Sequence, residues 1–225
     1  MPDLIKNALS DLHANGWASL HLPDDSASVI QQAALEIAFS LGQPKTTRRG
    51  GPLVDVLTPT NTQSANLRSL SARYGLRPFP WHTDGAHWDT PPRYLVMGCL
   101  EAAPRVAQTF LYEGSGFAPL NVDGARSSIF RVANGSNSFY TTARGTSDRY
   151  YRFDPGCMTP MDAGAHEIVR AIDLFEPADE HAITWQAGML LLLDNWRFLH
   201  RRGAAQGSTE RKLLRVTVME RSNHG

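Results

Sequence analysis

Two histidines and an aspartate lie close together in the segment FPWHTDGAHW, residues 79–88. His82 and Asp84 are two positions apart, so in an extended strand their side chains project to the same side. An imidazole nitrogen and a carboxylate oxygen placed in this way can hold one metal ion. His87 would face the other side of a continued strand, although Gly85 can turn the chain there. We therefore expect His87 to lie beside the ligands or near a substrate.

The segment MLLLLDNWRFLH, residues 189–200, supplies a third ligand. A buried apolar strand is followed by a polar break at Asp194 and Asn195 and a short return to His200. Two imidazoles and one carboxylate form a set that suits ferrous iron and leaves coordination positions open for an organic ligand and oxygen. Zinc sites use similar ligands, and a lone strand histidine is commonly an ordinary hydrogen-bonded residue. The arginine-containing segment after His200 helps to decide between an iron site, a zinc site and ordinary histidines.

The segment RKLLRVTV, residues 211–218, alternates so that Arg211, Leu213, Arg215 and Thr217 share one face of a strand. Two guanidinium groups in a protein interior are costly unless anions pair with them. A carboxylate-bearing cosubstrate would satisfy them, because arginine binds a carboxylate through two parallel hydrogen bonds. The alternative is that one or both arginines face solvent.

Length and composition limit the class of protein. A chain of 225 residues fits one domain spanning 1–225, and its 22 Lys and Arg balance its 22 Asp and Glu. This balance gives no support for a nucleic-acid partner or an anionic membrane surface. The first residues lack the apolar core of a signal peptide, and no apolar run is long enough to span a membrane. We therefore expect a soluble, cytoplasmic protein, in which Cys99 and Cys157 serve packing.

The elements expected to position these residues are mainly β. Apolar spacing predicts helices over residues 3–15 and 26–41, the second after Asp24, Asp25 and Ser26 as candidate N-caps. Short β-rich runs follow: LVDVLT, RYLVMGCL, VAQTFLYE, SFYTT, RYYRF, HAITW, MLLLLD and LLRVTVME. Residues 114–136 fit either a short helix or a loop. Strands without regular intervening helices favour a sandwich or barrel, with the two helices packed on one sheet.

With these residues assembled, the chain from about Leu41 onward resembles the Fe(II)- and 2-oxoglutarate-dependent oxygenases of the taurine dioxygenase and clavaminate synthase-like superfamily. The resemblance is carried by HTD at 82–84, DNWRFLH ending at His200, RKLLR from Arg211, and their order and spacing. It implies a double-stranded β-helix, the cupin-like jelly roll, in which His82, Asp84 and His200 bind iron.

The resemblance also implies a site for the cosubstrate 2-oxoglutarate. Arg211 would anchor its distal carboxylate. Thr109 stands 25 residues after Asp84, at a position where the family has a threonine that helps to hold the same carboxylate. The alternative is that Thr109 is an ordinary strand residue, present because threonine favours β-strands. Arg215 matches a second family arginine that faces either the substrate or the cosubstrate, and its role stays open.

The implied activity is hydroxylation of a small organic molecule with O₂, releasing succinate and CO₂. Retention of Asp84 disfavours halogenation, whereas desaturation, epoxidation and cyclisation depend on how the substrate is placed. Two alternatives remain: a metal-dependent jelly-roll enzyme that does not use 2-oxoglutarate, and a non-catalytic ligand-binding jelly roll. Arg48 and Arg49 would either meet an anionic substrate or form a solvated pair. Neither the substrate nor the oligomeric state follows from the sequence.

Overall fold

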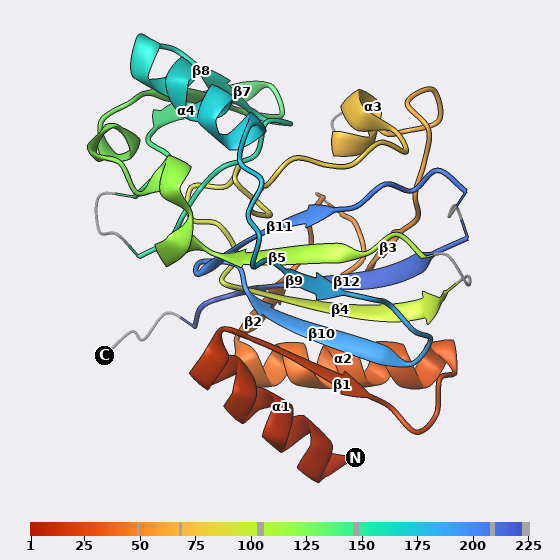
Figure 1. The fold of residues 1–225 in the computed structure, drawn as a ribbon. Helices are drawn as coiled ribbons and strands as arrows, with labels where there is room; N and C mark the ends of the chain where they lie inside the picture. Colours follow the sequence, from red (N-terminus) through yellow and green to blue (C-terminus); the bar gives the residue numbers. More distant parts are fainter. Residues whose placement is uncertain (49, 68, 103–105, 146–148, 208–209, 222–225) are drawn as a thin grey trace.

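The computed structural model describes residues 1–48, 50–67, 69–102, 106–145, 149–207 and 210–221, and over these residues the chain is mainly β with few helices (Figure 1). The helices are α1 (Pro2–Asn15), α2 (Ala27–Leu41), α3 (Leu70–Tyr74), α4 (Ala163–Asp173) and the short 3-10 turns η1 (Gly114–Gly116), η2 (Ala118–Leu120) and η3 (Asp123–Arg126). None of the helices among these residues combines the length and the apolar character needed to cross a bilayer.

Two sheets pack face to face and a third sheet lies beyond them (Figure 1). The major sheet has the order β1-β10-β4-β12-β2, and β3 also pairs with β12. Its strands are β1 (Trp17–His21), β2 (Gln43–Lys45), β3 (Asp55–Leu57), β4 (Tyr94–Glu101), β10 (Met189–Asp194) and β12 (Lys212–Met219). The minor sheet, β11-β5-β9, comprises β11 (Phe198–Arg202), β5 (Thr109–Glu113) and β9 (His181–Ile183). The third sheet, β7-β6-β8, comprises β7 (Asn137–Thr141), β6 (Phe130–Asn134) and β8 (Met158–Pro160).

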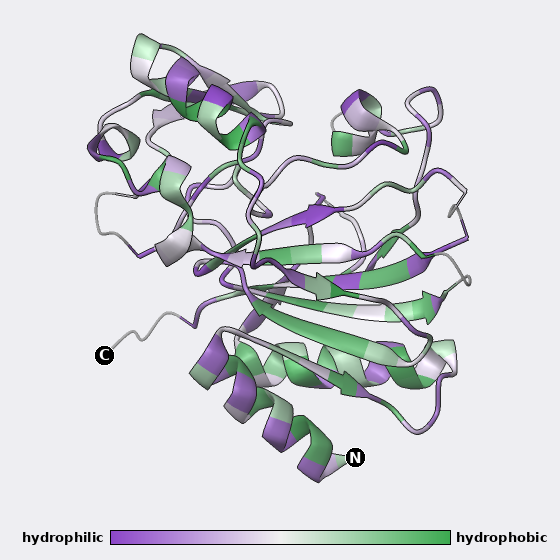
Figure 2. Ribbon diagram, viewed as in Figure 1, coloured by the Kyte–Doolittle hydropathy of each residue, from purple (hydrophilic) through white to green (hydrophobic). Residues whose placement is uncertain are grey.

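The alternation of side chains along β12 explains how the layers are built. Leu213 joins the apolar cluster between the major and minor sheets, whereas Leu214, Val216 and Val218 join the cluster under α1 and α2. The major sheet is therefore buried on both faces, which accounts for the almost unbroken apolar sequence of its central strands (Figure 2). The expected packing of the two N-terminal helices on one sheet is confirmed.

One expected strand is absent, one helix was not expected, and one segment left open by the sequence is now defined. RYYRF, residues 149–153, forms no strand; Tyr151 makes only an isolated bridge with Arg144. The α4 helix was not expected, although Asp162 caps it by accepting a hydrogen bond from the Ala165 amide. The uncertain residues 114–136 contain the three 3-10 turns and the strand β6.

Candidate metal centre

Backbone pairing brings the HTD segment next to the distal histidine. His82 and His200 form an isolated antiparallel bridge in which each amide donates to the other's carbonyl, at 3.0 and 2.9 Å. The expected extended strand around His82 is therefore reduced to one bridge at the edge of β11. Beyond it the chain turns at Gly85, whose φ of +69° lies in the left-handed region that favours glycine.

Asn195 fixes the position of Asp84. This fully buried amide accepts a hydrogen bond from the Asp84 amide at 2.8 Å and donates to the carbonyls of Asp84 and Pro92 at 3.0 and 2.8 Å. Asn195, directly after β10, thus holds the backbone of Asp84 in place. From Asn195 the chain continues into β11, which carries His200. The side chains of residues 82, 84 and 200 converge as a result.

Three side-chain atoms that can bind a metal ion point toward one place, one each from His82, Asp84 and His200. The Asp84 Oδ1 atom lies 3.8 Å from His82 Nε2 and 3.7 Å from His200 Nε2, and one ligand atom from each residue lies within 4.8 Å of the others. His82 Nδ1 contacts the Pro80 carbonyl at 2.9 Å. A carbonyl only accepts, so the proton of His82 lies on Nδ1 and the Nε2 lone pair faces the centre. These residues therefore fit a divalent metal ion.

Charge and burial keep the ligands in metal-binding forms. Burial alone would raise the pKa of Asp84, but Arg215, His200 and His82 outweigh it and hold that pKa at about 2. Burial, and then the charge of His82, lower the pKa of His200 to about 3. A carboxylate and a neutral imidazole are the forms that bind metals.

Arg215 lies against the metal centre. Its Nη1 donates to Asp84 Oδ2 at 2.7 Å and its Nη2 donates to Asp55 Oδ2 at 3.0 Å. Asp55, on β3, also accepts a hydrogen bond from the Thr47 hydroxyl. The sequence interpretation did not single out Asp55, because its partner Arg215 is 160 positions away.

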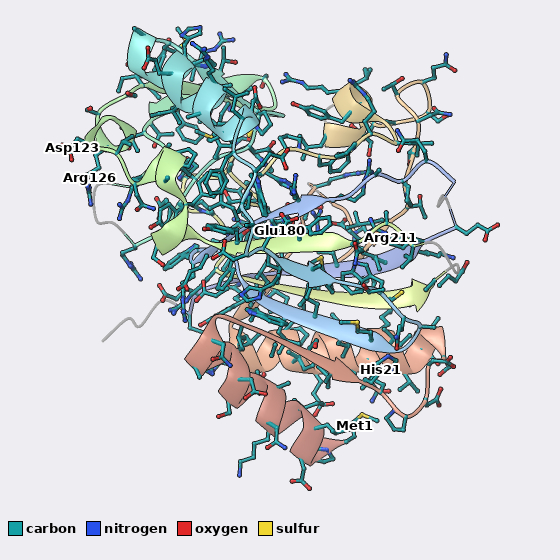
Figure 3. The ribbon with its side chains drawn as sticks, in the orientation of Figure 1. Met1, His21, Asp123, Arg126, Glu180 and Arg211 are labelled. Carbon is teal, nitrogen blue, oxygen red and sulfur yellow. The ribbon has the colours of Figure 1, made fainter. Side chains whose placement is uncertain are left out.

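Arg211 lies elsewhere between the two sheets, near the start of β5 (Figure 3). It is buried, donates from Nη1 to the Ala107 carbonyl at 2.7 Å, and leaves its buried Nε without a hydrogen bond within the described part of the chain. Thr109 begins β5, and its buried hydroxyl oxygen accepts a hydrogen bond from Trp185 Nε1 at 3.0 Å. The structure thus brings Arg211 and Thr109 to one region and Arg215 to another.

The remaining candidates lie outside the ligand set. His87 is half-buried and is not one of the three clustered residues; burial lowers its pKa, against the opposing charges of Asp154 and Asp84. Arg48 is exposed, and Arg49 lies outside the described residues. Asp154, which the sequence interpretation also missed, is a half-buried carboxyl whose pKa is raised by burial.

A family model independently matches the second half of the chain. Residues 133–217 match the model described as taurine catabolism dioxygenase TauD, TfdA family. The matched segment includes His200, Arg211 and Arg215 but not His82 or Asp84, whose place in the site therefore rests on geometry. A search of curated proteins finds no match.

Solved structures match almost the whole chain. An asparagine oxygenase in complex with Fe(II), 2S,3S-3-hydroxyasparagine and succinate superposes with a TM-score of 0.73 at 20% identity, over 97% of this chain and 80% of that one. The chain therefore has the fold of this oxygenase. The non-heme iron oxygenase OrfP, in complex with Fe and alpha-ketoglutaric acid, superposes with a TM-score of 0.68 at 20% identity, over 97% of this chain and 79% of the other. OrfP in complex with Fe, succinate and (3S)-hydroxy-L-Arg gives the same TM-score and identity. The fold shared with these oxygenases thus extends over the segment that contains His82 and Asp84.

Proposed function

We propose that the protein is an Fe(II)- and 2-oxoglutarate-dependent dioxygenase whose single domain, residues 1–225, is a double-stranded β-helix. The observation that carries the proposal is the convergence of two imidazole nitrogens and one carboxylate oxygen at a buried point. His82, Asp84 and His200 would hold ferrous iron, and the bound iron would supply the activation of oxygen. The overall reaction converts a substrate C–H bond, 2-oxoglutarate and O₂ into a C–OH bond, succinate and CO₂.

A second group of residues supports 2-oxoglutarate as the cosubstrate. No carboxylate of a described residue forms an ion pair with Arg211, although its guanidinium is buried and burial lowers its pKa to about 10. Because the oxygen of Thr109 already accepts from Trp185, the hydroxyl proton of Thr109 is left to donate. Arg211 and Thr109 together would bind the distal carboxylate of a keto diacid.

Arg215 takes a different part in this proposal from Arg211. Both of its terminal nitrogens donate to carboxylates, one on Asp84 and one on Asp55. We assign to it the task of holding Asp84 Oδ2, so that Oδ1 alone turns toward the metal. Contact with 2-oxoglutarate is thereby left to Arg211 and Thr109.

The substrate proposed is a small organic molecule. The superposed structures contain hydroxylated asparagine and arginine, so free amino acids are the first compounds to test. Hydroxylation is the outcome expected, because those bound products carry new hydroxyl groups.

An anaerobic visible spectrum tests this proposal. Addition of 2-oxoglutarate to the protein with one equivalent of Fe(II) is expected to give a weak charge-transfer band, since the keto acid chelates the metal. Release of succinate under air should require both Fe(II) and 2-oxoglutarate. Iron uptake without the band would favour a metal enzyme that uses no 2-oxoglutarate, and absence of iron uptake would favour a non-catalytic binding protein.

A further inference from the structure

A second buried arginine lies between the sheets on the same strand as the distal histidine. Arg202 is two positions after His200 on β11, so their side chains share the inward face of that strand. Only 6% of Arg202 and 5% of Arg211 is exposed. The neighbouring Arg201 projects from the other face of the strand, and its guanidinium binds Glu180 with an Nη2–Oε2 distance of 2.8 Å.

The strand register places Arg202 beside the proposed cosubstrate residues. Arg202 is the direct partner of Thr109 in the pairing of β11 with β5, and the next residue, Gly203, donates its amide to the Gln108 carbonyl. Arg211 reaches the same stretch through the Ala107 carbonyl. The backbone of Arg202 and the guanidinium of Arg211 therefore both lie next to residues 107–109, and Arg202 and Thr109 project from directly paired positions of neighbouring strands.

The guanidinium of Arg202 is oriented by its contacts but is not neutralised. Its Nη2 donates to the carbonyls of Gly75 and Arg77 at 2.6 and 2.7 Å, and the group lies 3.6 Å from the centre of the Phe79 ring. Its Nη1 makes no hydrogen bond to any residue that the structure describes, and no described carboxylate forms an ion pair with it. Burial and then the charge of Arg211 lower the pKa of Arg202 to about 10.

Two buried cations without an anion are unfavourable, and their cost is relieved when an anion binds between them. A carboxylate has two oxygens and can accept several hydrogen bonds at once. We infer that Arg202 joins Arg211 in binding the distal carboxylate of the keto acid and thereby makes the site selective for keto diacids over keto monoacids. This inference rests on the proposed function and adds a specificity-determining residue to it.

The test compares two keto acids of equal length. 2-Oxopentanoate has the same five-carbon chain as 2-oxoglutarate but ends in a methyl group in place of the distal carboxylate. The dissociation constant of each is measured anaerobically on the Fe(II)-loaded protein from the charge-transfer band. Arg202→Met removes the charge and keeps an unbranched side chain over Phe79. Arg201→Met is the matched control, because it removes the same charge from the neighbouring position on the outer face.

Arg202→Met is expected to weaken binding of 2-oxoglutarate by about tenfold or more, since a charge-assisted hydrogen bond is lost. It should leave the affinity for 2-oxopentanoate within about twofold, and Arg201→Met should preserve the preference for the diacid. Arg202→Gln, which keeps donors for the Gly75 and Arg77 carbonyls, is measured in the same way if the methionine variant does not fold.

Equal weakening of both keto acids would overturn the inference, because it would show that Arg202 only holds the 75–79 segment. Unchanged affinity for 2-oxoglutarate would overturn it as well. In both cases the unmodified protein still gives its band, so the proposed function survives. Absence of the band from the unmodified protein overturns the proposed function and this inference together.

Discussion

The two oxygens of Asp84 have different partners, and this division organises the metal centre. Oδ1 faces the Nε2 atoms of His82 and His200, while Oδ2 accepts a hydrogen bond from Arg215. A carboxylate held in this way can offer one oxygen to a metal and keep a fixed orientation. Loss of Asp84 would therefore remove a proposed ligand, whereas loss of Asp55 would disturb only the orientation of that carboxylate.

Replacing a ligand should abolish iron binding. For Asp84→Ala and for His200→Ala we expect no stoichiometric Fe(II) uptake and no succinate release, since two protein ligands remain of three. Anaerobic equilibrium dialysis measures the uptake, and far-ultraviolet circular dichroism checks that the fold persists. One equivalent of tightly bound iron in either variant would contradict the ligand assignment.

Asp55→Asn tests the support of Arg215. The amide no longer shares the charge of Arg215, so the guanidinium competes more strongly with iron for Asp84, and Fe(II) affinity should fall by roughly tenfold. Thr47→Val removes only the hydrogen bond to Asp55 and keeps its charge, so a smaller loss is expected there. Equal iron affinity in Asp55→Asn and the unmodified protein would show that Asp55 does not act on the metal centre.

The clustering of the proposed ligand residues was predictable from sequence to the extent that their spacing is local. His82 and Asp84 stand two apart, and the alternation along residues 211–218 is confirmed for the residues of β12. Asp55 and Arg202 gave no such signal, because their roles depend on partners that only folding brings near. The same alternation rule could nevertheless have predicted the position of Arg202, because residues two apart in a strand share a face and Arg202 is two after His200.

At the scale of elements, the turn that follows Asp84 depends on the absence of a side chain at Gly85. A Cβ atom added there would lie 2.3 Å from Cδ of Pro92, and the positive φ is itself unfavourable for other residues. The turn carries the chain from the metal ligands toward His87 and explains why no continued strand forms.

Gly85→Ala should destabilise the protein by about 3 kcal/mol, from the backbone conformation and the clash with Pro92 together. Gly50→Ala is the matched control: Gly50 has a φ of +71°, but a Cβ atom there meets nothing within 4 Å. The control should cost only about 1 kcal/mol. Urea denaturation measures both, and equal losses would mean that Pro92 moves aside without cost.

The local sequence pattern predicted the type of element correctly for strands whose residues are almost all apolar. It predicted the wrong type where contacts with distant residues determine the structure. The apolar strands β4, β10 and β12 were all expected. Residues 149–153 have β-type composition, yet Arg152 is buried and donates to the carbonyls of Ala86, Trp88 and Asp89 instead of entering a sheet. The α4 helix had a readable signal in Asp162 and the apolar spacing of Ala165, Ile168 and Ile172.

At the scale of the whole molecule, the space between the major and minor sheets is apolar in one part and polar in another. Leu95, Leu193 and Phe198 fill the apolar part, while the metal ligands and buried arginines occupy the polar part. The polar part includes groups whose ionisation changes on folding, so the stability of the metal-free protein should depend on pH.

The metal-free protein should lose stability as pH falls below about 6.5. His200 has a pKa of about 3 in the folded protein against 6.5 for an ordinary histidine, so the unfolded chain binds its proton first. This contribution is fully present above pH 6.5 and is lost as pH falls toward 3. Thermal melts of the apoprotein across this range measure the loss, and His200→Gln should reduce its slope. An unchanged slope would assign the effect to other groups.

The strand that carries Arg215, and that begins directly after Arg211, also dictates when the site can assemble. β12 follows every other described strand in the chain, yet it lies inside the major sheet, between β4 on one side and β2 and β3 on the other. During synthesis β4 therefore stays unpaired on that side, as do β2 and β3, until β12 leaves the ribosome and inserts between them. The proposed metal centre is therefore expected to acquire its ion only after β12 has been synthesised and has entered the major sheet.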